Sequence, residues 1–143
     1  MLVKQISVFL ENKSGRLAEV TKVLGDNNIN ISALSIADTT DFGILRIIVN
    51  DPDKAEKVLK ENDFTVSSTD VIAIGVPDKP GGLEMALRVL NEESIGIEYM
   101  YAFVGKTEEE ALVILRVEAL EEAADKLVKS GVNVLSSNKV YKL

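Results

Sequence analysis

The stretch PDKPGGL at residues 77–83 has a weaker copy, ENKSGRL, at residues 11–17. The two stretches lie 66 positions apart, and the same offset aligns further aliphatic residues, for example Leu24 with Leu90. After two extra residues near 104–110, an offset of 68 continues the match through the rest of each copy. Because the matches keep one register over a whole series of elements, the chain is a duplication of a unit of about 70 residues.

Each copy has the pattern of a strand, a helix, two strands, a helix and a strand. In the first copy we expect a strand at 3–10, a helix with apolar positions from Leu17 to Leu24, strands at 29–37 and 43–50, and a helix at 51–62. In the second copy the matching last helix is expected at 120–130, ending at Gly131. This order is the ferredoxin-like split βαβ. It predicts an α+β fold of two tandem βαββαβ domains with antiparallel sheets, packed side by side.

The expected domain boundary falls near Thr69, giving domains at 1–69 and 70–143. Segments 64–76 and 132–142 each suggest a strand, a serine-rich break and another strand. The second domain is therefore expected to carry an extra C-terminal strand at Lys139 to Lys142. Such a strand would add to a sheet edge.

Composition excludes several classes of function. The chain has neither Cys nor His, so thiol chemistry, zinc–thiolate sites and histidine bases are excluded, and no metal or cofactor is expected. Its net charge is −7, which disfavours a nucleic-acid partner. No apolar run is long enough for a membrane span, and no signal peptide begins the chain, so a cytoplasmic protein is expected. The acidic run from Glu108 to Glu110 fits a solvated turn.

The two copied stretches each connect an expected strand to an expected helix. A helix N-terminus presents unpaired N–H groups and a positive dipole end, which together favour an anion. Gly15 and Gly81 lack a Cβ, so a ligand carboxylate could approach the backbone closely. Asn12 and Asp78 stand where a side chain could bind the ligand or cap the helix. The simpler alternative is that all four are good turn and cap residues.

In these loops the sequence resembles the ACT domain, whose hallmark is an acidic or amide residue, a spacer, Pro-Gly, one further residue and Leu. The second copy has the complete pattern, whereas the first has Ser14 where proline is usual. The later segment Asn28–Ile31 resembles the family's helix-to-strand signature, and Ser94–Ile97 is a weaker counterpart. The resemblance covers essentially the whole chain.

The resemblance implies a site for a free L-amino acid at the interface between two side-by-side ACT domains. The residues it implicates in the loops are Asn12, Gly15, Arg16, Leu17, Asp78, Pro80, Gly81, Gly82 and Leu83, and those at the second strands are Asn30, Ile31, Ser32, Gly96, Ile97 and Glu98. Within one chain, loop 77–83 would face residues 30–32, and this pocket is expected to be the better of the two. If first copies pair between chains instead, Asn12 and Asn30 would share a pocket.

The function expected from these observations is that of an allosteric amino-acid sensor without catalytic activity that acts as a homodimer. The alternative is a regulatory subunit docked on an amino-acid biosynthetic enzyme. An enzyme is disfavoured because the chain offers no convergent set of titratable groups.

Overall fold

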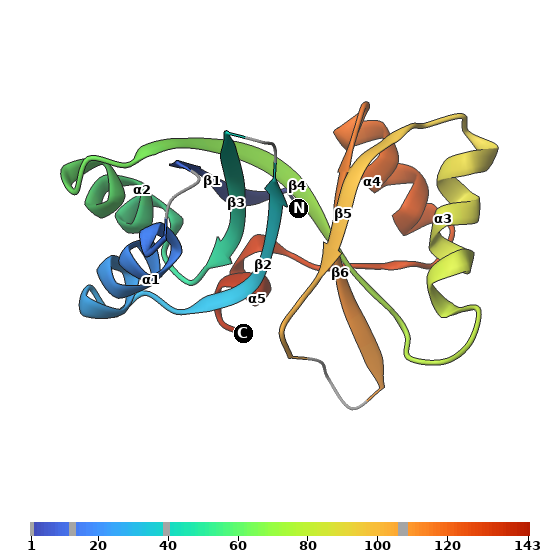
Figure 1. The fold of residues 1–143 in the computed structure, drawn as a ribbon. Coiled ribbons are helices and arrows are strands. Elements are labelled where there is room, and N and C mark those ends of the chain that lie inside the picture. Colours follow the sequence, from blue (N-terminus) through green and yellow to red (C-terminus); the bar gives the residue numbers. More distant parts are fainter. Residues whose placement is uncertain (1, 12–13, 39–40, 106–108) are drawn as a thin grey trace. The chain divides into compact units, whose positions relative to one another are not determined.

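The computed structural model describes the whole chain except residues 1, 12–13, 39–40 and 106–108 (Figure 1). The chain divides into two compact units. The N-terminal unit comprises Lys4–Thr69 and Tyr141–Leu143, and the C-terminal unit comprises Met1–Val3 and Asp70–Val140. The ends of the chain are thus exchanged between the units: the Lys4 N–H donates to the Tyr141 hydroxyl (2.9 Å), and Leu2 packs on the C-terminal core.

The N-terminal unit is a split βαβ fold. Its elements are β1 (Val3–Glu11), α1 (Arg16–Asp26), β2 (Ile31–Asp38), β3 (Phe42–Val49), α2 (Pro52–Glu61) and the first part of β4 (Thr65–Pro77). The strand order is β2-β3-β1-β4, and β3 runs antiparallel to both β1 and β2. Both helices cover one face of this sheet (Figure 1).

Alternation along β1 builds the N-terminal core. Ile6 and Val8 lie opposite Ile47 and Leu45 of β3, and all four are buried in one apolar cluster with residues of α1 and α2. This confirms that Ile6 and Val8 share a face, as the period of two predicts. The α2 helix also begins as predicted, because the Lys54 N–H donates to the Asp51 carboxylate at 3.2 Å.

The C-terminal unit repeats the arrangement. Its elements are the second part of β4, α3 (Gly82–Glu92), β5 (Ile97–Ala102), β6 (Glu110–Val117), α4 (Leu120–Lys129), β7 (Asn133–Val134) and α5 (Ser137–Tyr141). The strand order is β5-β6-β4-β7, in which these strands are the equivalents of β2, β3, β1 and β4 of the N-terminal unit. The predicted α+β class and the βαββαβ order are confirmed.

Two predictions about strands are wrong. The β4 strand runs unbroken through Ser67 and Ser68, because exposed serines are compatible with a strand that has a solvated face. The extra C-terminal strand is absent, because residues 137–141 form the short helix α5. Ser136 starts this helix: its hydroxyl accepts from the Lys139 N–H at 3.3 Å, and its carbonyl accepts from the Val140 N–H at 3.1 Å.

The cap of α2 gives a first testable prediction. Replacing Asp51 by Ala leaves the Lys54 N–H without its acceptor, so the free energy of unfolding should fall by about 1 kcal/mol. Asp51→Asn is the matched control and should retain most of the stability, because an amide oxygen also caps. Chemical denaturation of the parent protein and the two variants measures the three free energies of unfolding. Equal losses in both variants would contradict a role for the cap.

Candidate ligand-binding loops

Two glycines occupy equivalent positions at the starts of α1 and α3. Gly15 has φ 90° and Gly81 has φ 85°, and each is the N-cap residue of its helix. The left-handed region is open to glycine at little cost but costs other residues about 1–2 kcal/mol. A Cβ at either position would meet no atom within 4 Å, so backbone conformation alone demands these glycines.

Gly82 is required for a different reason. A Cβ at this position would lie 1.9 Å from the carbonyl oxygen of Pro77, a separation that no side chain can occupy. The loop is tight because the Lys79 N–H donates to that same oxygen (2.9 Å) and the Gly82 N–H donates to the Lys79 carbonyl (3.0 Å). A Gly-Gly pair is therefore needed to turn from β4 into α3.

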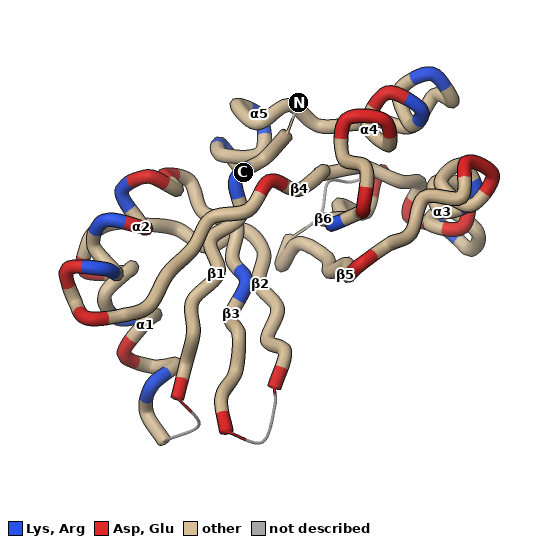
Figure 2. The backbone as a smooth tube through the Cα atoms, turned by 90° about the horizontal axis from the view of Figure 1, so that it is seen from above, with Lys and Arg blue, Asp and Glu red and all other residues tan. Residues whose placement is uncertain are grey.

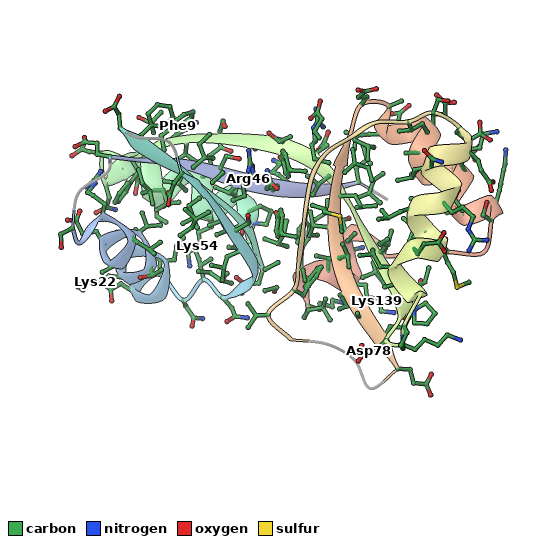
Figure 3. All side chains as sticks on the ribbon, turned by 45° about the vertical axis from the view of Figure 1, so that its right-hand side comes forward. Phe9, Lys22, Arg46, Lys54, Asp78 and Lys139 are labelled. Atoms are coloured by element: carbon green, nitrogen blue, oxygen red, sulfur yellow. The ribbon has the colours of Figure 1, made fainter. Side chains whose placement is uncertain are left out.

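The N-cap residues of α1 and α3 have no side chain that could accept from the first-turn N–H groups. The α2 helix differs, because its N-cap Asp51 fills this role. Of the two polar residues predicted beside the glycines, Asn12 lies outside the described residues. Asp78 is exposed at the end of β4 (Figure 3), and its N–H donates to the Glu109 carbonyl at 3.2 Å.

Each of these helices pairs its first-turn glutamate with an arginine. Arg16 Nη1 lies 2.7 Å from Glu19 Oε2, and Arg88 Nη2 lies 2.6 Å from Glu84 Oε2. The hydrogen bond from Arg88 lowers the pKa of the Glu84 carboxyl below its ordinary value. Figure 2 shows basic residues lying beside acidic ones on the helices. The pairing offsets acidic charge that would otherwise repel an anion from these N-termini.

The Arg16 side chain contacts Phe64 as well as Glu19. Its Cζ lies 4.5 Å from the centroid of the Phe64 ring, a cation–π contact that fixes the guanidinium. Its Nε is buried and has no hydrogen-bond partner in the part of the chain that the structure describes. Arg16 and Leu17 line a hollow of about 160 Å³, whose other lining residues are Leu10, Glu11, Ile36, Asp38 and Gly43.

The predicted residues at the start of β2 do not join this hollow. The Asn30 N–H donates to Asn50 Oδ1 at 2.9 Å, and Ile31 packs against the core. The Ser32 hydroxyl lies 3.5 Å from the Leu143 carbonyl oxygen. Because Ile36 and Asp38 at the far end of β2 line the hollow, loop 14–17 and residues 30–32 lie at opposite ends of that strand within the unit.

The second set of predicted strand residues has structural contacts of its own. A Cβ at Gly96 would lie 2.6 Å from Glu118 Oε1, so a side chain there would displace this carboxylate. Ile97 is paired with Val117 and is 37 % exposed. The Glu98 carboxylate accepts from Arg116 Nε at 3.2 Å. Of the remaining loop residues, Pro80 is exposed and Leu83 packs partly against the core.

Sequence reasoning missed the role of Glu110. Glu108 lies outside the described residues, but Glu110 begins β6, is half-buried and accepts a hydrogen bond from Asn133 Nδ2 at 2.9 Å. Its carboxylate lies about 2.8 Å from where a Cβ of Gly75 would be. The signal available in the sequence was Gly75 itself, since a glycine inside a strand often marks such a close approach.

Among the described residues, no three His, Cys, Asp or Glu side chains are grouped so that they could hold a metal ion. Within the same residues, none of the helices has both the length and the apolar character needed to cross a membrane.

Two units of identical strand order, each with a glycine-capped turn from its first strand into its first helix, define a duplicated ferredoxin-like protein. The family model of the ACT domain pair matches residues 1–143, so the protein belongs to that family. A search of curated proteins found no match.

Solved structures with this fold include both a similar chain and more distant ones. Protein BT0572 from Bacteroides thetaiotaomicron is 49 % identical, with a TM-score of 0.94 over 100 % of this chain and 98 % of that one. The regulatory subunit of aspartate kinase from Thermus thermophilus, in its ligand-free form, is 15 % identical, with a TM-score of 0.62 over 90 % and 92 %. Its counterpart from Thermus flavus is 14 % identical, with a TM-score of 0.62 over 89 % and 88 %.

The glycine pair gives a second testable prediction. Gly82→Ala should lower the free energy of unfolding by at least about 2 kcal/mol, because the Pro77 carbonyl must move. Gly81→Ala should cost about 1–2 kcal/mol from its left-handed φ alone. Gly25→Ala, inside α1 with open space around it, is the control and should be neutral or stabilising. A Gly82→Ala variant as stable as Gly25→Ala would contradict the geometry.

Proposed function

We propose that this ACT domain pair is a non-catalytic regulatory protein that binds a free L-amino acid at its strand-to-helix loops. The observation that carries the proposal is the pair of glycine N-caps at Gly15 and Gly81, each in a left-handed conformation. A glycine N-cap leaves first-turn N–H groups approachable by a carboxylate. The helix dipole favours the same negative group.

The chemistry of the loops suits a zwitterion. The ligand carboxylate accepts from first-turn N–H groups of α3, and its ammonium is placed near the acidic Asp78, which is exposed beside the turn. Each polar group of the ligand that stays unpaired in a buried site costs about 1–3 kcal/mol, so both ends need partners. The expectation from the sequence, that residues 30–32 complete the pocket of loop 77–83, is kept as part of this proposal.

The solved neighbours support a regulatory role. The two Thermus proteins that share the fold are regulatory subunits of aspartate kinase. By analogy, binding of an amino acid to the present chain changes how the chain acts on a protein partner. The partner is a second copy of the chain in a free-standing sensor, or an amino-acid biosynthetic enzyme if the chain is a docked subunit.

One surface of the N-terminal unit favours association with a protein. Leu34 and Ile36 of β2 are 43 % and 42 % exposed, and Leu17 of α1 is 40 % exposed. The β2 strand is the outermost in the strand order of its unit, and an edge strand can pair with a strand of another chain. We propose that two chains associate through this strand.

Ligand binding is tested by a thermal-shift screen of the parent protein against the twenty amino acids, because a ligand selective for the folded state raises its melting temperature. Titration calorimetry with the best ligand should show a loss of at least about tenfold in affinity for Asp78→Ala. Asp125→Ala, on the exposed surface of α4, is the control and should bind as the parent does.

The same titration ranks the predicted pockets. If loop 77–83 faces residues 30–32, Asn30→Ala should cost more affinity than Asn12→Ala. The reverse order would favour pairing of N-terminal units between chains. If the Gly15→Val, Gly81→Val double variant stays folded and binds as tightly as the parent, the loops are not the site.

Association is tested by light scattering at micromolar concentration, where the parent should be a dimer. Leu34→Lys places a charge on the exposed strand and should shift the protein towards monomer. Val128→Lys, at a position 44 % exposed on α4, is the matched control and should leave the dimer intact. A monomeric parent protein would contradict the association of chains.

A further inference from the structure

The first turn of α3 contains a carboxylate that can compete with a ligand for the helix N-terminus. Counted from the N-cap Gly81, Glu84 is the third helical residue, at position N3. A glutamate at N3 commonly reaches back to the backbone N–H of the N-cap residue, where the helix dipole also stabilises its charge. A carboxylate in that place would occupy the helix N-terminus that the proposed function assigns to a ligand.

In the structure, the Glu84 carboxylate is bound elsewhere. Within the described residues, α3 has no side-chain hydrogen bond at its N-cap, although a glutamate stands at N3. Arg88 Nε donates to Glu84 Oε1 at 3.0 Å, and Arg88 Nη2 donates to Glu84 Oε2 at 2.6 Å. One planar guanidinium thus engages both carboxylate oxygens. Because Arg88 lies one turn further along the helix, the contact draws the carboxylate away from the N-terminus.

The equivalent helix of the first copy has no carboxylate at this position. Position N3 of α1 is Ala18, and the first-turn glutamate of this helix is Glu19, one residue later. The residue aligned with Arg88 is Lys22, which pairs with Asp26 on the side away from the helix N-terminus. An N3 glutamate and an arginine that binds it therefore occur together in α3 and not in α1.

The contact between Glu84 and Arg88 is exposed to solvent. The side chains of Arg88 and Glu84 are 58 % and 61 % exposed, and an ion pair in such a place contributes little to folding stability. The hydrogen bonds from Arg88 stabilise the charged carboxylate, which is why the pKa of Glu84 lies below its ordinary value. The main consequence of the contact is therefore where the charged carboxylate lies, rather than how stable the fold is.

We propose that Arg88 is a positioning residue for the loop site, which holds the Glu84 carboxylate away from the N-terminus of α3 and leaves the first-turn N–H groups to a ligand carboxylate. Arg88 lies outside the predicted loop residues and acts through Glu84 rather than by touching the ligand. The consequence for binding rests on the proposed function. The position of the Glu84 carboxylate is measurable without any ligand.

The ligand-free experiment is a pH titration of the full chain by NMR. In Arg88→Ala, the released Glu84 carboxylate should reach the N-terminus of α3, and an amide that donates to a carboxylate shifts when that carboxylate is protonated. The Gly81 amide should then follow the titration of the Glu84 carboxyl carbon in Arg88→Ala and not in the parent protein. Arg88→Lys keeps the opposite charge and should resemble the parent. If no first-turn amide of α3 follows Glu84 in Arg88→Ala, the proposal is overturned.

The binding experiment uses as its probe the amino acid that gives the parent protein the largest thermal shift. By titration calorimetry, Arg88→Ala should weaken binding of this probe about two- to threefold, the size of effect expected from an exposed ion pair. Lys129→Ala is the matched control, because it removes one positive charge from the same unit and breaks an exposed pair with Asp125 at 2.9 Å. It should bind the probe as the parent does.

A double variant separates positioning from a direct effect of the arginine charge. Glu84→Ala removes the competing carboxylate, so it should bind the probe at least as tightly as the parent. Adding Arg88→Ala to Glu84→Ala should then cause no further loss. If Arg88→Ala weakens binding equally with and without Glu84, the arginine acts on the ligand itself and the positioning role is contradicted.

Failure of this inference differs from failure of the proposed function. Binding that is weakened by Asp78→Ala and unchanged by Arg88→Ala leaves the loop site standing and overturns the positioning role. If no amino acid binds to the parent protein, the proposed function fails and takes the consequence for binding with it. The pH titration of the Gly81 amide then still decides whether Arg88 keeps Glu84 from the N-terminus of α3.

Discussion

The structure depends on one constraint, which is the turn of the chain from a strand directly into a helix through a left-handed glycine. Gly15 and Gly81 make this turn in equivalent places, with φ 90° and 85°. Without it, α1 and α3 could not return across the sheet to bury residues such as Leu24 and Leu90. The same turn leaves the helix N-terminus without a capping side chain. A fold requirement thereby also creates a site that an anionic ligand group can approach.

The two copies differ in the residue that follows the left-handed glycine. Loop 77–83 contains a second glycine, forced by the Pro77 carbonyl, whereas the first copy has Arg16 at that position, stacked on Phe64. Equivalent folds therefore carry chemically different surfaces around the same turn. Such differences between copies are compatible with two sites that bind different ligands or bind one ligand with different affinity.

The fold was largely predictable from the sequence because its signals are local and duplicated. Short-range patterns explain the alternation at Ile6 and Val8 and the cap at Asp51. The constant spacing between matching residues of the two copies reveals the repeat. The final helix was not predictable by analogy with β4, because Ser136 initiates a helix whereas Ser67 and Ser68 stay in a strand. The roles of Gly96 and Glu110 depend on contacts with Glu118 and Asn133, which are distant in sequence.

The central claim is that a ligand carboxylate binds at the glycine-capped helix N-termini. The most direct measurement is the backbone amide NMR spectrum of the full chain with and without a saturating amino acid found to bind. The account predicts that the largest changes occur at the amides of Leu83 and Glu84 in the first turn of α3. Large changes elsewhere with these amides unaltered would contradict it.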